Sequence, residues 1–400
     1  MSKLKEVQHG LWNSSINPSN LSHSKRFLDI CWDDKNECIV WLELSGGKRK
    51  IIYQRLDQTT YQMETQSIGA GVGYGGGDIA VHSGHVYFID SNVGSIFRAP
   101  LFGNEVTPIA IPYGKAASPT PSPNGRHLVF VQSDDVTDSL VVVDTSRDNF
   151  VHTITDSADF YMQPCWHPNG NYLAWVEWDY PNMPWDGSRL MISKVHYLKN
   201  NQPKFDLPRI IAGGIEESIF QPLFNEEGTS LIFASDHLGW SNIWSYNFAT
   251  DTSNCVVSDE FDIASPAWIQ GLRSIACGQD GYIYFIRSEH NGRKAYRVRT
   301  NGTGLRPIEG LDQYEHIEQL SISRTGSHIA SIVSSPRQTA KLAVLTENRL
   351  HIVARSIDID LKSDSLSEPK SVSWPVKNGT TIHGLLYPPI SSRFCCKNLP

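Results

Sequence analysis

Short runs of alternating apolar and polar residues recur along most of the chain, and each run follows a polar turn that ends in glycine. The clearest copies are "SPTPSPNGRHLVFVQ", "MQPCWHPNGNYLAWVEW", "FQPLFNEEGTSLIFASD" and "IEQLSISRTGSHIASIV". A glycine at the end of the turn permits a positive φ, so the chain can reverse tightly between two strands. The spacing of these turns is roughly one or two units of about 45 residues. The turn glycines are Gly125, Gly170, Gly228 and Gly326.

Each unit continues beyond its first strand pair. Apolar runs at 139–143, 242–246 and 341–345 follow a second turn, and a weaker outer run comes after each. Looser copies of the whole phrase lie at 28–44, 75–90 and 265–286. Four short antiparallel strands in a unit of about 40 to 50 residues are typical of a β-propeller blade. The pattern therefore predicts an all-β fold, a β-propeller of about seven four-stranded blades.

The tryptophans are predicted to pack between these blades. A single blade cannot bury both faces of its sheet, so neighbouring blades must cover each other around the axis. Bulky aromatic side chains suit that interface better than a surface position. The residues expected as wedges are Trp32, Trp41, Trp166, Trp175, Trp244 and Trp268.

The stretch "SVSWPVKNGTTIHGLLYPP" near the end of the chain predicts a separate hairpin. Apolar and polar residues alternate on both sides of Asn378-Gly379, which is a favoured two-residue turn. A hairpin placed after the propeller indicates the opening of another domain. We therefore divide the chain into an amino-terminal segment at 1–25, the propeller at 26–365 and the start of a further domain at 366–400.

Composition narrows the function classes. The formal net charge is -7 and the pI is about 6.0, which gives no support for binding to nucleic acid or to an anionic membrane. The seven cysteines are scattered and form no C-x-x-C pair, so reduced thiols are expected. No amino-terminal apolar segment and no apolar run of roughly 18 residues is present, which predicts a cytoplasmic protein.

Four phrases carry a resemblance to a known family. They are "YGGGDIAVHSGHVYFID", "LAWVEWDYPNMPWDGSRLMI", "GGIEESIFQPLF" and "LIFASDHLGWSNIWSY". Together they resemble the propeller of prolyl oligopeptidase-family serine peptidases, in particular the dipeptidyl aminopeptidase and acylaminoacyl peptidase branch. The resemblance extends from about residue 10 to residue 389. It implies that the hairpin at 371–389 opens an α/β-hydrolase domain with a Ser-Asp-His triad, and that the propeller caps the active site and sieves peptide substrates.

The sequence contains no nucleophile elbow of the form G-x-S-x-G. Without a positioned serine, the acids and histidines of the chain have no triad to complete. We therefore assign no catalytic residue and predict a chain that is inactive by itself, cut short before the catalytic domain. The face that would meet that domain is expected to support self-association.

Two segments supply candidate substrate-binding residues. Glu216 and Glu217 form an acidic pair, and the resemblance to dipeptidyl peptidases implies that such a pair binds the free amino terminus of a substrate. Two carboxylates suit an ammonium group because each can accept a charge-assisted hydrogen bond. A solvated loop or an inter-blade salt bridge is the alternative. The insertion at 177–190 either contacts substrate or the hydrolase domain, or braces its blade. Its candidate polar and aromatic contacts are Glu177, Asp179, Trp185, Asp186 and Arg189.

Cofactor sites are not predicted. Gly71, Gly73 and Gly76 match a dinucleotide fingerprint in spacing, but strand alternation follows them where a helix is required. A glycine-rich loop that enters the second blade, and that closely approaches either the central tunnel or the partner domain, is the favoured interpretation. No metal-binding motif is present either, so we predict neither cofactor nor metal.

Three functional interpretations remain open. The first is the gating propeller of a serine peptidase. The second is a non-catalytic propeller that serves as an interaction scaffold. The third is a propeller enzyme such as a metal lactonase or a glycosidase, which would need a cluster of acidic and amide side chains at the tunnel mouth.

Overall fold

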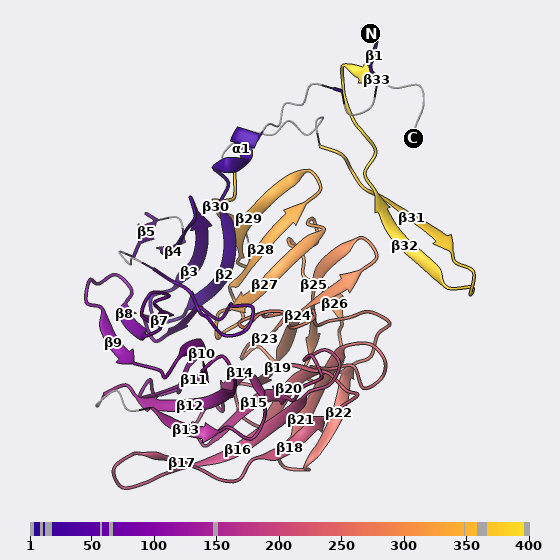
Figure 1. Cartoon of the computed structure of the whole chain (residues 1–400). Coiled ribbons are helices and arrows are strands. Elements are labelled where there is room, and N and C mark those ends of the chain that lie inside the picture. Colours follow the sequence, from indigo (N-terminus) through magenta and orange to yellow (C-terminus); the bar gives the residue numbers. More distant parts are fainter. Residues whose placement is uncertain are drawn as a thin grey trace.

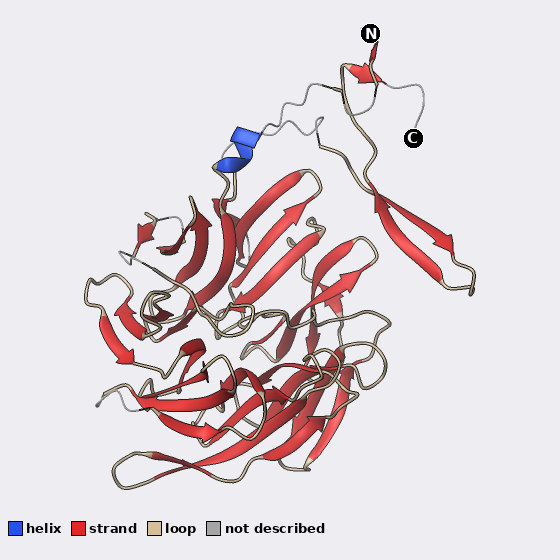
Figure 2. Cartoon of the chain, viewed as in Figure 1, coloured by secondary structure: helices blue, strands red, loops and turns tan. Residues whose placement is uncertain are grey.

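The structure is a computed structural model that describes residues 4–8, 11–12, 18–56, 58–63, 67–146, 151–347, 349–357 and 366–395. Strands dominate this part of the chain, and its one helix is the short α1 (Pro18–Ser22) (Figure 2). Among the described residues, no helix has both the length and the apolar character needed to cross a lipid bilayer.

The strands form antiparallel blades arranged in a ring (Figure 1). Five sheets contain one blade each. An eight-stranded sheet contains two more, joined at a single parallel bridge between Arg293 and His316. The described strands therefore form seven blades, which confirms the predicted all-β propeller and the predicted blade number.

The first four blades come from residues 26–213. Blade one is β2 (Arg26–Asp33), β3 (Cys38–Ser45), β4 (Lys48–Arg55) and β5 (Tyr61–Gln62). Blade two is β6 (Ile79–His82), β7 (His85–Ile89), β8 (Ile96–Pro100) and β9 (Thr107–Ala110). Blade three is β10 (Lys115–Pro121), β11 (His127–Ser133), β12 (Asp138–Asp144) and β13 (His152–Thr155). Blade four is β14 (Phe160–Trp166), β15 (Tyr172–Trp178), β16 (Arg189–Tyr197), β17 (Pro203–Phe205) and β18 (Arg209–Gly213).

The remaining three blades complete the ring. Blade five is β19 (Ile219–Phe224), β20 (Ser230–Ser235), β21 (Asn242–Asn247) and β22 (Thr252–Val257). Blade six is β23 (Ile275–Cys277), β24 (Tyr282–Glu289), β25 (Gly292–Arg299) and β26 (Arg306–Pro307). Blade seven is β27 (His316–Ile322), β28 (Ile329–Ser335), β29 (Gln338–Leu345) and β30 (Leu350–Arg355).

The hydrophobic core lies between neighbouring blades. Where the ring closes, Ile30 and Trp41 of blade one pack with Ala330 and Leu342 of blade seven. The backbone N–H of Trp32 also donates to a blade-seven hydroxyl over 2.9 Å. Comparable clusters fill the other blade interfaces. Each blade is therefore stabilised by its neighbours, as a repeat architecture requires.

The tryptophan prediction holds for five of its six residues. Trp32, Trp41, Trp166 and Trp175 are buried, and Trp244 packs partly buried against a core cluster. The prediction is wrong for Trp268, whose exposed fraction is 55%. It lies in a loop, because the inner strand of blade six begins only at Ile275.

Four inner strands carry β-bulges at residues with positive φ. These residues are Ser118, Gln163, Gln221 and Gln319 in blades three, four, five and seven. A bulge changes the direction of a side chain relative to the regular strand. Here each redirected side chain hydrogen-bonds to the segment that enters blade six, residues 268–274 or the start of β23 just beyond it. We call residues 268–274 the axial segment.

The axial segment crosses the middle of the ring, since it contacts all six other blades. Arg273 pairs with Asp29 of blade one, and Gln270 N–H donates to Gly75 O before blade two over 2.9 Å. Further hydrogen bonds reach Ser118 of blade three, Tyr161 and Gln163 of blade four, Gln221 of blade five, and Gln319 of blade seven. The axial segment is therefore held in the middle of the ring by contacts with blades on all sides of it.

Every inner strand begins on the same face of the ring, because the blades repeat around the axis. We call this the leading face. The axial segment, the loop before β6, and the turns between the second and third strands of each blade lie on it.

The carboxy-terminal hairpin stands beside the leading face, in yellow at the right of Figure 1. Its strands β31 (Lys370–Pro375) and β32 (Thr381–Leu386) are antiparallel, and Gly379 in the turn has φ +88°. This confirms the predicted ribbon. β1 (Lys5–Glu6) pairs in parallel with β33 (Phe394–Cys395), so the two ends of the described chain lie together. The predicted propeller end at residue 365 and the tail at 396–400 lie outside the described residues.

Candidate functional site: the leading face

A cavity of about 500 Å³ opens on the leading face beside the axial segment. Its charged lining consists of Arg26, Arg49, Arg273 and Arg293 together with Asp29, Asp78 and Glu318. Its apolar wall includes Phe27, Leu28, Trp268, Ile269, Leu272 and Ile332. A pocket with apolar walls and a few convergent charged groups is the usual form of a ligand site.

Two ion pairs fix the inner wall of this cavity. Arg273 binds Asp29 through Nη2, which also donates to the Ile30 carbonyl over 2.6 Å. Arg49 binds Asp78 over 2.6 Å, and that carboxylate accepts a second hydrogen bond from the backbone of the loop before β6. Burial raises the pKa of Asp29, and the positive charge of Arg273 acts in the opposite direction. These two guanidinium groups are therefore occupied within the chain.

The outer wall of the cavity carries the remaining charges. Glu318 Oε1 lies 2.9 Å from His316 Nε2. This hydrogen bond lowers the pKa of Glu318, and the charges of Arg293 and Arg26 act in the same direction. Arg293 donates to Ser274 Oγ over 3.4 Å, whereas its buried Nε makes no hydrogen bond with a described residue.

Exposed aromatic side chains border the cavity. The ring of Trp268 lies 4.3 Å from that of Trp185 and 6.1 Å from that of Tyr74, measured between centroids. Tyr74 is 72% exposed. The cluster joins the loop before β6, the insertion of blade four and the axial segment, which makes a large aromatic surface at the mouth.

The predicted acidic pair lies on the leading face just before β19. Glu217 accepts a hydrogen bond from Ser235 Oγ over 2.6 Å and lies 3.3 Å from His237 Nδ1. Its side chain is 23% exposed. Glu216 is exposed, and within the described part of the chain its side chain forms no hydrogen bond or ion pair. One carboxylate is therefore held in place and the other is open to solvent.

The structure brings three residues of the predicted insertion together. Arg189 Nη2 lies 3.2 Å from Glu177 and 2.8 Å from Asp179. Burial lowers the pKa of Arg189, but the hydrogen bond and charge of Asp179, with those of Glu177, outweigh it and raise the pKa. Glu177 is buried and also accepts a hydrogen bond from Trp175 Nε1 over 2.8 Å. This triad braces β15 against β16.

The other two predicted residues of the insertion lie apart from the triad. Asp186 accepts a hydrogen bond from the backbone N–H of Met183 over 3.0 Å and closes the loop. Trp185 belongs to the aromatic cluster at the mouth. The structure therefore does not unite the seven predicted residues in one pocket, although all of them lie in blades four and five or their connections.

The glycine-rich loop enters blade two at the leading face. Gly76 forms a parallel bridge with Gln270, and a Cβ atom at Gly76 would lie 2.3 Å from the Gln270 carbonyl oxygen. Its φ of +82° also favours glycine. These glycines thus allow the loop to approach the axial segment closely, as the favoured interpretation expected.

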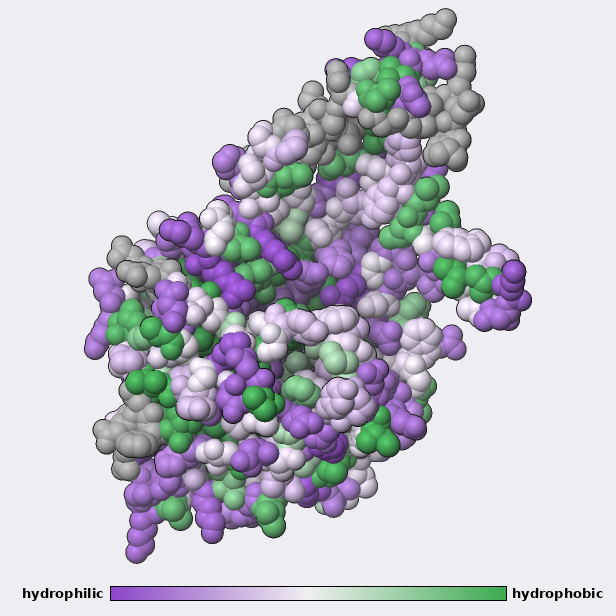
Figure 3. All heavy atoms as spheres, viewed as in Figure 1, coloured by the Kyte–Doolittle hydropathy of each residue, from purple (hydrophilic) through white to green (hydrophobic). Residues whose placement is uncertain are grey.

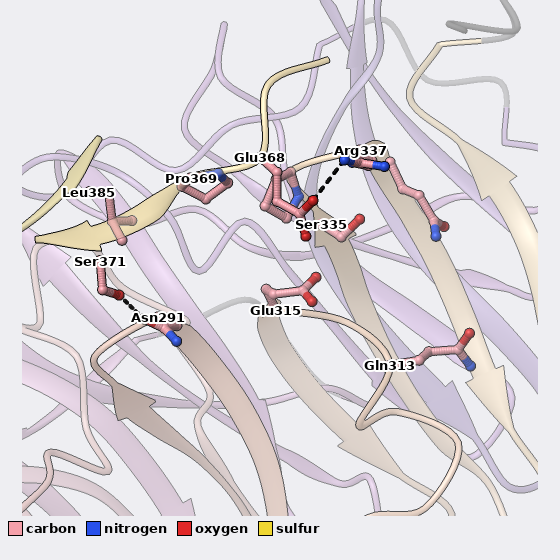
Figure 4. Close-up of a pocket in the computed structure, with 11 residues that line it drawn as sticks. Asn291, Gln313, Glu315, Ser335, Arg337, Glu368, Pro369, Ser371 and Leu385 are labelled. Atoms are coloured by element: carbon pink, nitrogen blue, oxygen red, sulfur yellow. Dashed lines mark hydrogen bonds and ion pairs between the residues drawn. The ribbon is translucent and has the colours of Figure 1, made fainter. Parts of the chain in front are cut away.

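A second cleft, of about 380 Å³, separates the base of the hairpin from blades six and seven (Figure 4). Glu368 and Arg337 form an ion pair across it over 2.7 Å, and Ser371 bonds to Asn291. Glu315 projects into the same cleft from the blade side. These polar contacts attach the base of the hairpin to the leading face, and the ring of His383, farther along the hairpin, stacks 5.3 Å from that of His290.

Sequence reasoning missed the charged cavity. Arg273 and Arg293 belong to the blade with the most degenerate repeat, Asp29 lies inside β2, and Asp78 directly precedes β6, so no local spacing marks them. The one signal in the sequence that could have indicated the cavity is a charged residue, such as Asp29 or Arg273, at a position where an inner strand is expected to be apolar. No cluster of three or more metal-ligating side chains exists among the described residues.

The strand arrangement defines the structural class of the chain. Its seven-bladed propeller has the fold of the propeller part of prolyl oligopeptidase-type peptidases. The fold that the sequence resemblance implies is thereby confirmed.

Individual solved structures agree with this class. The chain is similar to a puromycin-hydrolyzing peptidase of Mycobacterium tuberculosis, with a TM-score of 0.86 and 21% identity over 99% of this chain and 64% of that one. The values for puromycin hydrolase are the same. Prolyl oligopeptidase B from Galerina marginata gives 0.65 and 11% over 91% of this chain and 56% of its own. No family model and no curated protein matches the chain. This chain thus spans 64% of the length of the puromycin-hydrolyzing peptidase that it resembles.

Proposed function

We propose that this chain is the substrate-gating propeller of a serine peptidase that resembles dipeptidyl and acylaminoacyl peptidases. In the complete enzyme an α/β-hydrolase domain packs on the leading face and hydrolyses peptides, whereas this chain alone is inactive. The observation that carries the proposal is the structural match to a puromycin-hydrolyzing peptidase over 99% of the chain.

The axial segment bears on how the gate works. It contacts blades one, three, four, five and seven and the loop before blade two, and we infer that it obstructs the path of a peptide along the axis of the ring. In our proposal, substrates approach from the side, between the leading face and the hydrolase domain. Selection by size then depends on the width of that gap and on the loops at its edge.

The acidic pair supplies the contact for the substrate amino terminus. Glu217 is oriented by Ser235, and its neighbour Glu216 is exposed without a side-chain partner in the described chain. An ammonium group between two carboxylates would form charge-assisted hydrogen bonds with both. In this proposal Glu177, Asp179 and Arg189 hold the insertion in shape, and Trp185 faces the peptide from the aromatic cluster.

Calorimetry with two matched peptides tests the acidic pair. We expect Gly-Phe amide, which has a free amino group and no carboxylate, to bind at least tenfold more tightly than acetyl-Gly-Phe amide. Glu217→Gln should remove this preference. Glu227→Gln, an exposed carboxylate in the turn at the other end of blade five, is the control and should retain it.

The same preparations decide whether the chain acts alone. Incubated with an aminoacyl p-nitroanilide and a fluorophosphonate probe, they should release no nitroaniline and take up no label. Turnover together with labelling would overturn the proposed inactivity. Equal binding of the free and acetylated peptides would overturn the role of the acidic pair.

A non-catalytic scaffold is the second candidate function, and one observation favours it. One face of the hairpin carries Val372, Trp374, Ile382 and Leu386, all of them exposed. Figure 3 shows apolar atoms on the surface of this hairpin. Such a face suits a protein partner or a second copy of the chain.

Under both functions we place the protein in the cytoplasm, where the free thiols of the six described cysteines would stay reduced.

A further inference from the structure

Two guanidinium groups on the wall of the leading-face cavity, those of Arg26 and Arg293, form no ion pair with a described residue, and Arg26 is the exposed one of the two. Arg293, near the start of β25, forms no ion pair in the described part of the chain, and its buried Nε makes no hydrogen bond there. Arg273 and Arg49 in the same cavity are each paired with an aspartate. Burial lowers the pKa of Arg293, which the negative charge of Glu318 opposes.

A charge in this position is costly unless something compensates it. Removing a guanidinium from water without a paired anion is unfavourable, and each unused N–H adds to that cost. Glu318 compensates only part of the positive charge of Arg293. Its side chain is half exposed, is hydrogen-bonded to His316, and also interacts with the charge of Arg26. The cavity therefore presents a surplus of positive charge.

The shape and polarity of the cavity define the anion. The planar fork of an arginine matches a carboxylate in two parallel hydrogen bonds. Beside Arg293, the buried side chains of Phe27 and Ile332 form an apolar wall. Ile332 pairs across the sheet with Glu318, which places the apolar wall next to the charged one.

We propose that the leading-face cavity binds a carboxylate that carries an apolar group, with Arg293 as its charge partner and Phe27 and Ile332 as the apolar wall. The carboxy terminus of a short peptide and a small organic acid share this chemistry. Binding needs only this chain, so the inference does not depend on the proposed peptidase function.

The test is calorimetry on the whole chain with acetyl-Gly-Phe, acetyl-Gly-Phe amide and acetate. We expect the peptide acid to bind at least tenfold more tightly than its amide in low salt. A peptide acid that also exceeds acetate tenfold shows that the apolar group contributes to binding, whereas equal binding of acetate would overturn the role of Phe27 and Ile332 as an apolar wall. Equal binding of acid and amide, or no binding of the acid at millimolar concentration, would overturn the proposal.

Variants locate the site. Arg293→Gln should abolish the preference for the acid. Arg297→Gln is the matched control, because Arg297 lies on the same strand and also has a buried, unused Nε but does not line this cavity. A preference that survives in Arg293→Gln would refute the assignment. If that variant does not fold, the acid and amide comparison on the unaltered chain still decides. Because these peptides have a blocked amino terminus, their result is separate from the test of Glu217.

Discussion

At the scale of single residues, His127 couples protonation to stability. It is buried in β11, packs 5.6 Å from the ring of Tyr197, and makes no side-chain hydrogen bond of normal geometry with a described residue. Burial lowers the pKa of His127, although the charge of Asp144 acts in the other direction. Because folding lowers the pKa of this histidine, the unfolded chain binds a proton at a higher pH than the folded chain does. Acidification therefore stabilises the unfolded state relative to the folded state. Stability is therefore complete above the unfolded pKa of about 6.5 and is lost as the pH falls below it.

We expect the free energy of unfolding, measured with urea between pH 7.5 and 5.5, to decrease on acidification by up to about 1.4 kcal/mol per pH unit for this group. His127→Phe should flatten that decrease. His152→Phe, at an exposed position on β13, should not. His82 and His328, whose pKa values burial also lowers, account for the slope that remains. An unchanged slope in His127→Phe would contradict this account.

The residue scale also shows where sequence reasoning succeeds and fails for the site. An adjacent pair such as Glu216 and Glu217 is visible in the sequence, and both residues do lie on the leading face. Arg293 could not be found in this way. The proposed role of Arg293 rests on its having no carboxylate partner in space. The packing of blades six, seven and one determines which groups surround it, and the sequence does not show that packing.

At the scale of elements, one buried ion pair helps to hold the axial segment, beside its hydrogen bonds to the bulged residues. Replacing Arg273 by Gln leaves Asp29 buried without its partner, which typically costs roughly 3 to 5 kcal/mol. We expect Arg273→Gln to lower the free energy of unfolding by this order and to speed hydrogen exchange in residues 268–274. The double variant Asp29→Asn with Arg273→Gln should recover part of the loss, because no buried charge remains.

A solvent-exposed pair provides the comparison. Lys115 and Asp135 lie 2.6 Å apart but are both exposed, so Lys115→Gln should cost less than about 1 kcal/mol. If Arg273→Gln proved no more damaging than Lys115→Gln, or if exchange rose equally throughout the ring, the ion pair would not be what holds the axial segment.

The elements themselves were predictable to the extent that their signals are local. Turn glycines and alternating residues indicate the blades, and Asn378-Gly379 indicates the hairpin, because both depend on neighbours in the sequence. For the axial segment the repeat pattern instead predicts an inner strand, with Trp268 as a wedge between blades, and both predictions are wrong. The four bulged residues that hold the segment, Ser118, Gln163, Gln221 and Gln319, come from four different blades, so no window of the sequence contains the information.

At the scale of the whole molecule, the exposed hairpin is the surface that most needs a partner. Trp374 and Leu386 are 48% and 53% exposed on the same face of the hairpin, and polar contacts attach its base to the blades. Exposed apolar surface of this kind favours association, since burial removes it from water. We therefore expect the purified chain to self-associate through the hairpin and the adjoining leading face.

Sedimentation velocity over about two decades of micromolar concentration should show a weight-average mass that rises with concentration, as for a reversible association. Leu386→Ser should shift the association to at least tenfold higher concentration. Leu207→Ser is the control. It removes an equally apolar and even more exposed side chain from the connection between β17 and β18, away from the hairpin, and should leave the self-association unchanged. A monomer throughout, or equal effects of the two substitutions, would mean that the hairpin face does not mediate contacts between copies. Its apolar side chains would then have to be covered by a different protein surface.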